Sequence, residues 1–375
     1  MTAPFRPDAN APATLPFPSA SASPVGGIGG NIGGGIGGDI GLDLGTTAFR
    51  SLCRENGRLV GRREVAAYTV LPRRPEPQRL LQSAGIPFSR VPDGLIVVGQ
   101  AAVDVAASFE SPLVPLMPGG ELPLGDPIGR QVAAMLLESV LGPQQSRSGR
   151  VCVMTVPGSP GPQEDTPTLL FFSQMVKLAG LVPQVVHSGA ATAAASFTDR
   201  SLRGIGVSIG ASHTDVAIIV RGYETGWHRI PIGGDTVDAR LIDRHKAYLH
   251  DRHGDRFPDF LSVRRWKESP DRSLLNRDAA GLTLAESYGD VTLSAARAVV
   301  DLLQHHRETG TPRPLPCVVS GGPTAMAGFE PLWTQALRGV GLLDQLGEVR
   351  IEPDAEYEVA RGLLLYTEAG TRMAA

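Results

Sequence analysis

The feature that most limits what this chain can fold into is a strand–turn–strand pattern that occurs twice. Residues 38–47 read Gly-Asp-Ile-Gly-Leu-Asp-Leu-Gly-Thr-Thr, which predicts an apolar strand that ends in an acidic residue and a Gly-Thr turn. A further strand is expected over residues 48–53. Residues 205–221 repeat this order about 165 residues later, with a turn of small residues that begins at Gly210. Two matching units in one chain favour two related lobes that face one ligand across a cleft.

The first turn contains the residue types of a phosphate-binding site. Asp43 stands at a strand end, where a carboxylate can hold a hydrated metal ion. Gly45 lets the backbone approach a phosphate, and Thr46 and Thr47 add hydroxyl and N–H donors. Taken alone, these residues fit an ordinary glycine-rich hairpin with a polar tip equally well. The second unit favours the phosphate-binding interpretation, because two hairpins with matching turns are less common by chance.

Strands and helices alternate along the rest of the chain, which predicts α/β layers. Buried strands are expected over residues 151–156 and 316–320, and the second of these leads into two glycines. Apolar residues recur at helical spacing in several other segments. The helices are expected over residues 166–178, 189–197, 236–249 and 291–305.

Composition limits the class of protein. The chain has 375 residues, 42% of them hydrophobic, so it can bury a large core but exceeds the size of one compact domain. Its net charge of −3 gives no basic surface for nucleic acid, and we expect no nucleic-acid partner. Cys53, Cys152 and Cys317 lie far apart in predicted strands, which favours buried reduced thiols. No segment reaches the ~18 apolar residues of a membrane span, and we expect a cytoplasmic protein.

The N-terminal segment differs from the rest. Residues 1–24 are rich in Pro, Ala and Ser, without the basic start and apolar stretch of a signal peptide. Residues 25–38 alternate Gly-Gly with isolated Ile, and such a glycine-rich stretch cannot bury enough apolar surface to pack. We expect residues 1–36 to be a disordered, flexible tail.

Five segments, taken together, resemble a known superfamily. In chain order they are the first turn, an apolar strand that ends in proline, the Ala-rich helix after His187, the second turn and a Gly-Gly-Pro turn; a softer match lies in the last helix. These segments cover residues 43–47, 151–157, 188–197, 207–215, 318–323 and 357–362. Their set and order resemble the actin-like ATPases, which include actin, the bacterial rod-shape actin homologues, the heat-shock chaperone ATPases and sugar kinases.

The resemblance implies a two-lobed, ribonuclease H-like α/β fold with a nucleotide cleft between the lobes. The first lobe would span residues 37–203 and the second residues 204–345, with a closing helix in residues 346–375 that returns to the first lobe. It also implies ATP and Mg²⁺ as cofactors, with the metal near Asp43. The residues expected around the nucleotide are Gly45, Thr46, Thr47, Gly210, Ala211, Ser212, His213, Thr214, Gly233, Gly234, Asp235, Lys267, Gly321, Gly322 and Pro323.

Further details are similar to the rod-shape homologues and the chaperone ATPases. Residues 230–238 resemble the strand-to-helix turn that both groups place after the second phosphate hairpin, and residues 115–120 resemble a segment of the rod-shape group. Lys267 stands where these families keep a lysine near the nucleoside. Their glutamate three residues earlier is Arg264 here, so this nucleoside contact departs from the family pattern.

The chain lacks acidic residues where the active members of the superfamily keep them. The second loop of those members begins with an aspartate, where this chain has Ser208, and Ala211 and Ser212 replace two of the glycines that follow. Their Ala-rich helix opens with a glutamate or glutamine that positions water, whereas residues 188–191 here read Ser-Gly-Ala-Ala. We therefore expect weak or absent hydrolysis and assign no catalytic residue. His213 is a candidate substitute, because a neutral imidazole can orient water; the alternative is a loop histidine that faces solvent.

Three classes of function remain. The first is a divergent, nucleotide-binding actin-like protein with weak or absent hydrolysis, a pseudoenzyme that acts as a scaffold or binds an unidentified protein partner or itself. The second is a working ATPase of the rod-shape or heat-shock chaperone type, including one that forms filaments. The third is a small-molecule kinase, although the chain is short for those kinases and offers no evident sugar-site aspartate in its second lobe. We predict the first.

Overall fold

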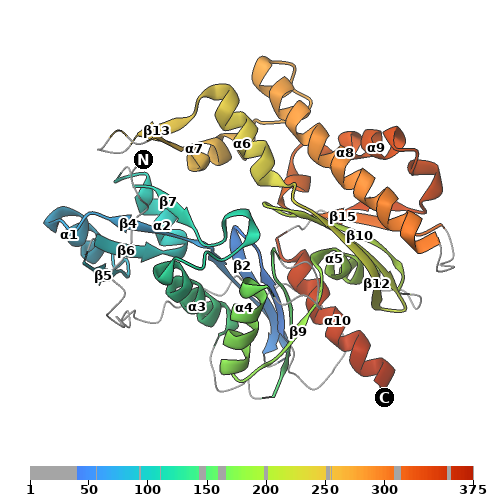
Figure 1. Ribbon diagram of the computed structural model, residues 1–375, viewed down its shortest axis with the longest axis horizontal. Coiled ribbons are helices and arrows are strands. Elements are labelled where there is room, and N and C mark those ends of the chain that lie inside the picture. The colour runs from blue at the N-terminus through green and yellow to red at the C-terminus, as the bar shows by residue number, and fades with distance from the viewer. Residues whose placement is uncertain are drawn as a thin grey trace. The chain divides into compact units, whose positions relative to one another are not determined.

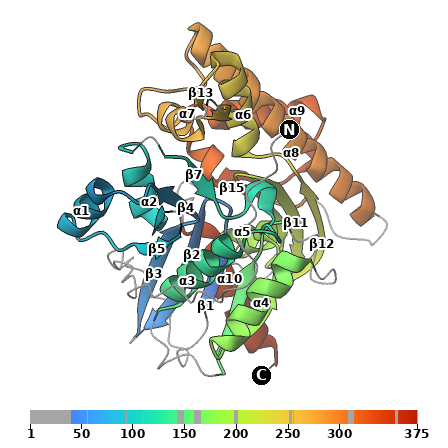
Figure 2. The same cartoon turned by 60° about the vertical axis from the view of Figure 1, so that its left-hand side comes forward.

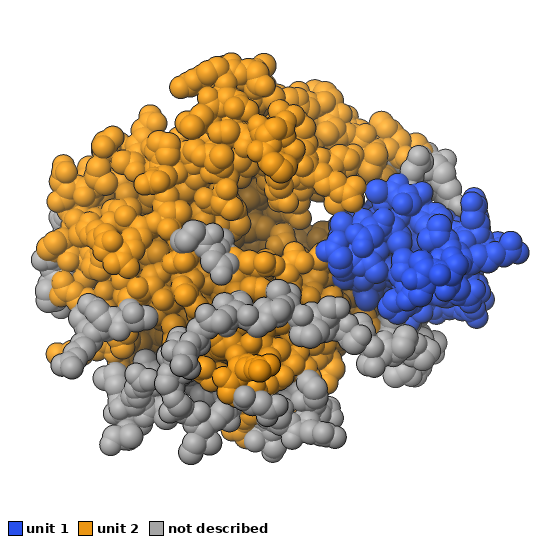
Figure 3. All heavy atoms as spheres, turned by 180° about the vertical axis from the view of Figure 1, so that it is seen from behind, with its two compact units in different colours: residues 1–21, 67–114 blue, residues 22–66, 115–375 orange. Residues whose placement is uncertain are grey.

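The computed structural model describes residues 40–374, except residues 56, 93, 110, 143–148, 159–165, 198–201, 251–253, 255, 308–313 and 353–355. The tail predicted over residues 1–36 lies outside the described residues. The described chain is a mixture of strands and helices, which confirms the predicted α/β class (Figures 1 and 2). It divides into a smaller compact unit, residues 67–114, and a larger one, residues 40–66 and 115–374 (Figure 3).

The smaller unit is a sheet with two short helices, and the sequence analysis did not predict it. The strands run in the order β5-β6-β4-β7. Their bounds are β4 (Ala67–Leu71), β5 (Ser89–Val91), β6 (Gly94–Val98) and β7 (Leu113–Pro115), with helices α1 (Pro75–Ser83) and α2 (Gly99–Ala106). The apolar core of this unit consists of Leu71, Leu81, Leu95, Val97, Ala102 and Val105.

The first sheet of the larger unit contains the first turn. Its strand order is β3-β2-β1-β8-β9, in which β1 pairs antiparallel with β2 and parallel with β8. The strands are β1 (Ile40–Leu44), β2 (Ala48–Glu55), β3 (Arg58–Val65), β8 (Val151–Thr155) and β9 (Val182–Val185). Asp43 therefore lies at the end of a central strand.

The second sheet repeats this topology. Its strand order is β12-β11-β10-β15-β16, in which β10 pairs antiparallel with β11 and parallel with β15. The strands are β10 (Gly204–Ile209), β11 (Thr214–Val220), β12 (Tyr223–Ile230), β15 (Cys317–Ser320) and β16 (Val349–Ile351). The pattern found twice in the sequence is thus a duplication of the sheet order, with each turn at the end of a central strand.

Helices cover both sheets of the larger unit. They are α3 (Pro127–Leu141), α4 (Pro167–Leu178), α5 (Ser188–Ser196), α6 (Gly234–His245), α7 (Phe260–Lys267), α8 (Ala279–Arg307), α9 (Phe329–Gly339) and α10 (Glu358–Ala374). A hairpin of β13 (Tyr248–His250) and β14 (Arg256–Pro258) follows α6, and single 3-10 turns occur at Pro118–Gly120, Gly322–Ala325 and Leu343–Gln345. None of the helices in the described part of the chain is long and apolar enough to cross a membrane.

Two helices connect the sheets. Helix α5 packs on β10 and β11 of the second sheet, α10 packs on β1 and β8 of the first, and the two helices lie side by side (Figures 1 and 2). The absence of a side chain at Gly362 permits this contact, because a Cβ there would lie 1.8 Å from the carbonyl oxygen of Ala191. The closing helix thus contacts the first sheet and α5 together.

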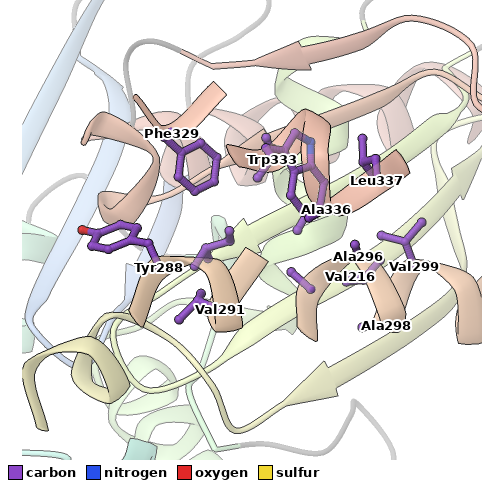
Figure 4. Close-up of a cluster of buried hydrophobic side chains, with 14 of the residues drawn as sticks. Val216, Tyr288, Val291, Ala296, Ala298, Val299, Phe329, Trp333, Ala336 and Leu337 are labelled. Atoms are coloured by element: carbon purple, nitrogen blue, oxygen red, sulfur yellow. The ribbon is translucent and has the colours of Figure 1, made fainter. Parts of the chain in front are cut away.

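The largest hydrophobic core lies over the second sheet. Tyr288 and Val291 of α8 face Phe329 and Trp333 of α9, while Val216 comes from the sheet beneath (Figure 4). The three cysteines are free and buried, as predicted.

Candidate functional site

The two turns have the same geometry. The pair Leu44 and Phe49 closes the first turn and the pair Ile209 and Thr214 closes the second, so both connections are equally long. A Cβ at Gly45 would meet the carbonyl oxygen of Ala48 at 3.0 Å, and one at Gly210 would meet that of His213 at 3.0 Å. Gly45 and Gly210 are therefore equivalent positions, as are the residues that follow them.

The first turn places an arginine beside its carboxylate. Asp43 and Arg50 are directly opposite in the β1–β2 pairing, so their side chains share one face of the sheet. Arg50 Nη1 lies 3.4 Å from Asp43 Oδ2 and 3.6 Å from the position of a Cβ on Gly45. Burial raises the pKa of Asp43, although the charge of Arg50 and its hydrogen bond oppose this shift. The sequence analysis did not anticipate this arginine.

Three glycine-containing segments meet at the second turn. The N–H of Gly234 donates to the carbonyl of Gly210 at 3.0 Å, and that of Asp235 donates to the carbonyl of Ala211 at 2.8 Å. Gly321 has φ +120°, and a Cβ there would lie 2.0 Å from the carbonyl oxygen of Ile209. Pro323 lies close to Gly234: a Cβ on Gly234 would be 3.6 Å from Pro323 Cγ. The predicted residues of 210–214, 233–235 and 321–323 thus form one group.

Segments that join the first sheet to its helices also reach this group. A Cβ on Gly120 would lie 3.3 Å from Ser212 Oγ and 3.1 Å from the backbone nitrogen of Gly158, which follows β8. Arg229 Nη1 of β12 donates to the carbonyl of Val156 at 3.4 Å. Gly120 therefore lies between the second turn and the chain that leaves β8, the strand beside Asp43, and Arg229 of β12 contacts that chain directly.

A buried carboxylate lies at the centre of the second hairpin. Asp215 is opposite Arg229 in the β11–β12 pairing and accepts hydrogen bonds from its Nε at 2.5 Å and Nη2 at 2.7 Å. The Ser188 hydroxyl, at the start of α5, donates to the same carboxylate at 2.6 Å. Burial alone would raise the pKa of Asp215, but the charge and hydrogen bonds of Arg229 outweigh it and hold that pKa well below its usual value.

The His213 side chain is 16% exposed, which differs from the solvent-facing loop histidine given as the alternative. Its Nδ1 lies 2.9 Å from Ser212 Oγ, and its Nε2 lies 3.8 Å from Asp215 Oδ2. Burial lowers the pKa of His213 to about 4, with a smaller effect of Arg229 in the same direction and an opposing effect of Asp215. The imidazole is therefore neutral at pH 7, and its ring nitrogens face protein groups.

A second polar cluster precedes Ser188. His187 is buried, its Nδ1 lies 2.7 Å from Glu224 Oε1, and its ring stacks on Trp227 with centroids 4.1 Å apart. The Tyr366 hydroxyl of α10 accepts from the backbone N–H of Glu224 at 3.1 Å. These contacts fix the start of α5 against β12 and α10.

The predicted nucleoside lysine is engaged in an ion-pair network. Lys267 is buried, with Nζ 2.5 Å from Asp238 Oδ1. Arg264 bridges Asp238 at 2.8 Å and Asp235 at 2.5 Å. Arg264, which replaces a family glutamate, thus ties α7 to the start of α6, and the role of Lys267 at a nucleoside stays a prediction.

The donor groups at the two turns do not fit a bound divalent cation well. Asp43 has a guanidinium beside it, and both oxygens of Asp215 accept from Arg229. No group of three or more His, Cys, Asp or Glu side chains that could hold a metal ion occurs among the described residues. A nucleotide fits the arrangement better, because Gly322 has nothing within 4 Å of the position of a Cβ and the Ser320 hydroxyl beside Gly321 is buried without a partner in the described chain.

The sequence analysis missed Arg50, Arg229, Ser188 and Asp215 as interacting partners. Asp43 and Arg50 are seven residues apart and Asp215 and Arg229 are 14 apart. The only available signal was strand alternation around each turn, which places residues on a common face once the register is known. Neither arginine lies within a motif that was recognised.

The chain is similar to one family model and to several solved structures. The family model described as Volactin matches residues 39–366. A search of the curated proteins found no significant match. Among solved structures, the fold is similar to "MamK double helical filament", at 17% identity and a TM-score of 0.62, covering 88% of this chain and 98% of that one.

A second structural neighbour is "MreB 5 of Spiroplasma citri bound to AMPPNP", at 14% identity and a TM-score of 0.60, covering 90% of this chain and 97% of that one. The ADP-bound structure of the same protein has 15% identity and a TM-score of 0.62, covering 90% and 98%. The predicted two-lobed actin-like fold is confirmed.

Proposed function

Because the chain belongs to the Volactin family and has an actin-like fold, we propose that it binds an adenine nucleotide at its two turns and hydrolyses it weakly or not at all. The phosphates would contact residues 45–47 and 210–214, and the base would lie near Gly321 and Gly322. The structural neighbour MreB5 of Spiroplasma citri is described as bound to AMPPNP in one structure and to ADP in another, which supports a nucleotide as the ligand of this chain. The family match and the duplicated turns support the position.

The state of Asp215 is the observation that carries the proposal of weak hydrolysis. A base that activates water needs a carboxylate oxygen or imidazole nitrogen within hydrogen-bond reach of that water. Asp215 instead accepts two hydrogen bonds from Arg229 and two from Ser188, one from its hydroxyl and one from its backbone N–H. Ser188 stands at the start of α5, and the family resemblance implies an acid or amide at Ala190 or a small neighbour of it. Loss of a positioned general base typically lowers a rate roughly 10²–10⁴-fold.

A protein that binds nucleotide without rapid turnover can act through its conformation. Helices α5 and α10 join the two sheets, and α5 begins at the proposed phosphate site, so a bound nucleotide would contact an element that both sheets share. The neighbour MamK is described as a double helical filament, which supports self-association as one form of partner binding. A scaffold or partner-binding role is thus the proposed outcome.

His213 favours a second candidate, a slow ATPase with a histidine base. Its imidazole is neutral at pH 7 and lies 3.8 Å from the charged Asp215, an arrangement that can orient a base. Against it, Nδ1 already contacts Ser212 at 2.9 Å. The two candidates differ in what removal of the imidazole does to turnover.

The test combines binding and turnover on the full-length protein. Calorimetric titration with ATP should give saturable binding, and phosphate release should be slow and unaffected by Ser188→Ala, because Ser188 contacts Asp215 and no water-activating base. His213→Ala should also leave the residual rate unchanged. Loss of turnover in His213→Ala with retained ATP binding would support the second candidate, and absence of ATP binding would contradict both.

A further inference from the structure

The two arginines beside the turn carboxylates are bound very differently. Arg229 donates two short hydrogen bonds to Asp215, at 2.5 and 2.7 Å, and its remaining guanidinium nitrogen, Nη1, donates to the carbonyl of Val156. Arg50 lies 3.4 Å from Asp43, well beyond the ~2.7–2.9 Å of a charge-assisted hydrogen bond. Its Nε is buried and has no hydrogen-bond partner in the described part of the chain. Arg50 therefore retains donors that a ligand could use.

The Arg50 guanidinium lies against the first turn. Its Nη1 lies 3.6 Å from where a Cβ of Gly45 would be, and 3.5 Å from the carbonyl of Ala48 at the other end of the turn. By the equivalence of the hairpins, Arg50 occupies the place that Asp215 occupies in the second hairpin. The first turn thus carries a cation where the second carries an anion.

This cation conflicts with a divalent metal at Asp43. A metal ion held by the Asp43 carboxylate would lie within a few ångströms of a guanidinium, and two like charges at such a distance repel strongly in a partly buried site. Asp215 cannot compensate, because both its oxygens are used by Arg229. The residues present therefore do not fit the magnesium that the superfamily implies.

We propose that Arg50 takes over the charge-neutralising role of a metal, so that the phosphates of a nucleoside di- or triphosphate bind this turn without a divalent cation. A guanidinium presents a planar fork of donors that matches phosphate oxygens bidentately. The backbone N–H groups of the Gly45–Thr47 turn complete the anion site. The inference rests on the proposed nucleotide-binding function and deepens it.

The experiment is calorimetric titration of the full-length protein with ATP and with ADP, in magnesium chloride and in EDTA. For the wild type, the Kd in EDTA should lie within about threefold of that in magnesium. Arg50→Ala should weaken binding in EDTA about 10- to 100-fold, because a hydrogen-bonded charge is lost. Arg50→Lys should restore part of that loss, since it keeps the charge without the fork.

Two variants control the interpretation. Arg58→Ala removes an exposed positive charge at the far end of the β2–β3 hairpin and should leave both Kd values unchanged. Asp43→Ala should preserve ATP binding in EDTA or tighten it, because the substitution frees Arg50. If Asp43 were instead a metal ligand, the variant would lose the part of the ATP affinity that depends on magnesium. Circular dichroism and the thermal midpoint of each variant establish that it is folded.

Each result decides between the alternatives. Binding of ATP in magnesium that disappears in EDTA would overturn the inference and leave the proposed function intact. Unchanged affinity of both Arg50→Ala and Arg50→Lys in EDTA would overturn it as well. Absence of binding in either buffer would overturn the proposed function together with the inference.

Discussion

The buried pair of Asp215 and Arg229 gives the sharpest stability prediction. The Asp215 side chain is 1% exposed and that of Arg229 is 11% exposed. Asp215→Ala leaves the guanidinium buried without two of its hydrogen bonds and the Ser188 hydroxyl without its acceptor. Breaking a buried ion pair from one side typically costs about 3–5 kcal/mol, and we expect this loss in the free energy of unfolding.

Two companion variants separate the charge from the packing. Asp215→Asn keeps one acceptor oxygen and should lose about 1.5–3 kcal/mol, the range for a hydrogen bond to a charged group. The double variant Asp215→Leu with Arg229→Met replaces the pair by apolar side chains and should be less destabilised than Asp215→Ala, because no charge is left unpaired.

The assay is equilibrium unfolding in urea followed by tryptophan fluorescence. All three tryptophans, Trp227, Trp266 and Trp333, lie in the larger unit, so the signal reports that unit alone. Midpoints are compared at a common slope, since a changed slope would indicate a changed unfolding transition. A loss below about 1 kcal/mol for Asp215→Ala, or a double variant as unstable as the single one, would refute the reasoning.

The same pair predicts a pH dependence with a definite sign. The folded pKa of Asp215 lies below its ordinary value of 3.8, because Arg229 outweighs the effect of burial. Its contribution to stability is therefore fully present above about pH 4 and is lost as the pH falls below 3.8 toward the folded pKa. Asp215→Asn should flatten this acid limb of the unfolding curve.

Three further predictions concern other parts of the larger unit. Gly362→Ala should strongly lower the free energy of unfolding in urea, because its Cβ would lie 1.8 Å from a backbone oxygen of α5. Gly289→Ala in α8 is the control: its Cβ would meet nothing within 4 Å, so the variant should be as stable as the wild type or more stable. Equal effects of the two substitutions would contradict the contact between α10 and α5. Burial raises the pKa of Glu358 from 4.5 to about 7, so the free energy of unfolding should fall as the pH rises from 4.5 to about 7. Glu358→Gln should remove this pH dependence. An unchanged pH dependence in the variant would exclude this carboxyl as its source. Burial raises the pKa of Cys152 and Cys317 to about 12, so a thiol reagent should modify both only after unfolding, and fast reaction of the native protein would contradict their burial.

The duplicated topology could be predicted because its signal is local. Each unit is a run of apolar residues, a turn with a glycine at a fixed position and a second apolar run, and all three parts are adjacent in the sequence. The four central strands β1, β2, β10 and β11 follow those segments closely. The Ala-rich helix is likewise found as α5, at Ser188–Ser196.

The smaller unit could not be predicted because its elements are short. Strands β5 and β7 have three residues each, and α1 and α2 have nine and eight. Segments of that length carry too few apolar positions to distinguish the two-residue period of a strand from the 3.6-residue period of a helix. Helix α8 was recognised only in its second half, since polar residues and Gly289 interrupt the apolar pattern near its start.

The charges of the site depend on contacts that only the fold creates. Arg229 reaches Asp215 through the β11–β12 register, and Ser188 reaches it from a helix 27 residues away in the chain. The burial of His213 has the same origin, since its ring lies between Ser212 and Asp215. The sequence identified the turns, whereas the neutralisation of their carboxylates follows from strand register and helix packing.

Phosphate release from ATP under single-turnover conditions tests the central claim most directly. With the protein in excess and ATP fully bound, wild-type release should be roughly 10²–10⁴-fold slower than that of an active actin-like ATPase measured in parallel, because Asp215 accepts from Arg229 and Ser188 and Asp43 lies beside the Arg50 guanidinium. Release at the rate of the active enzyme from the same bound state would contradict the account.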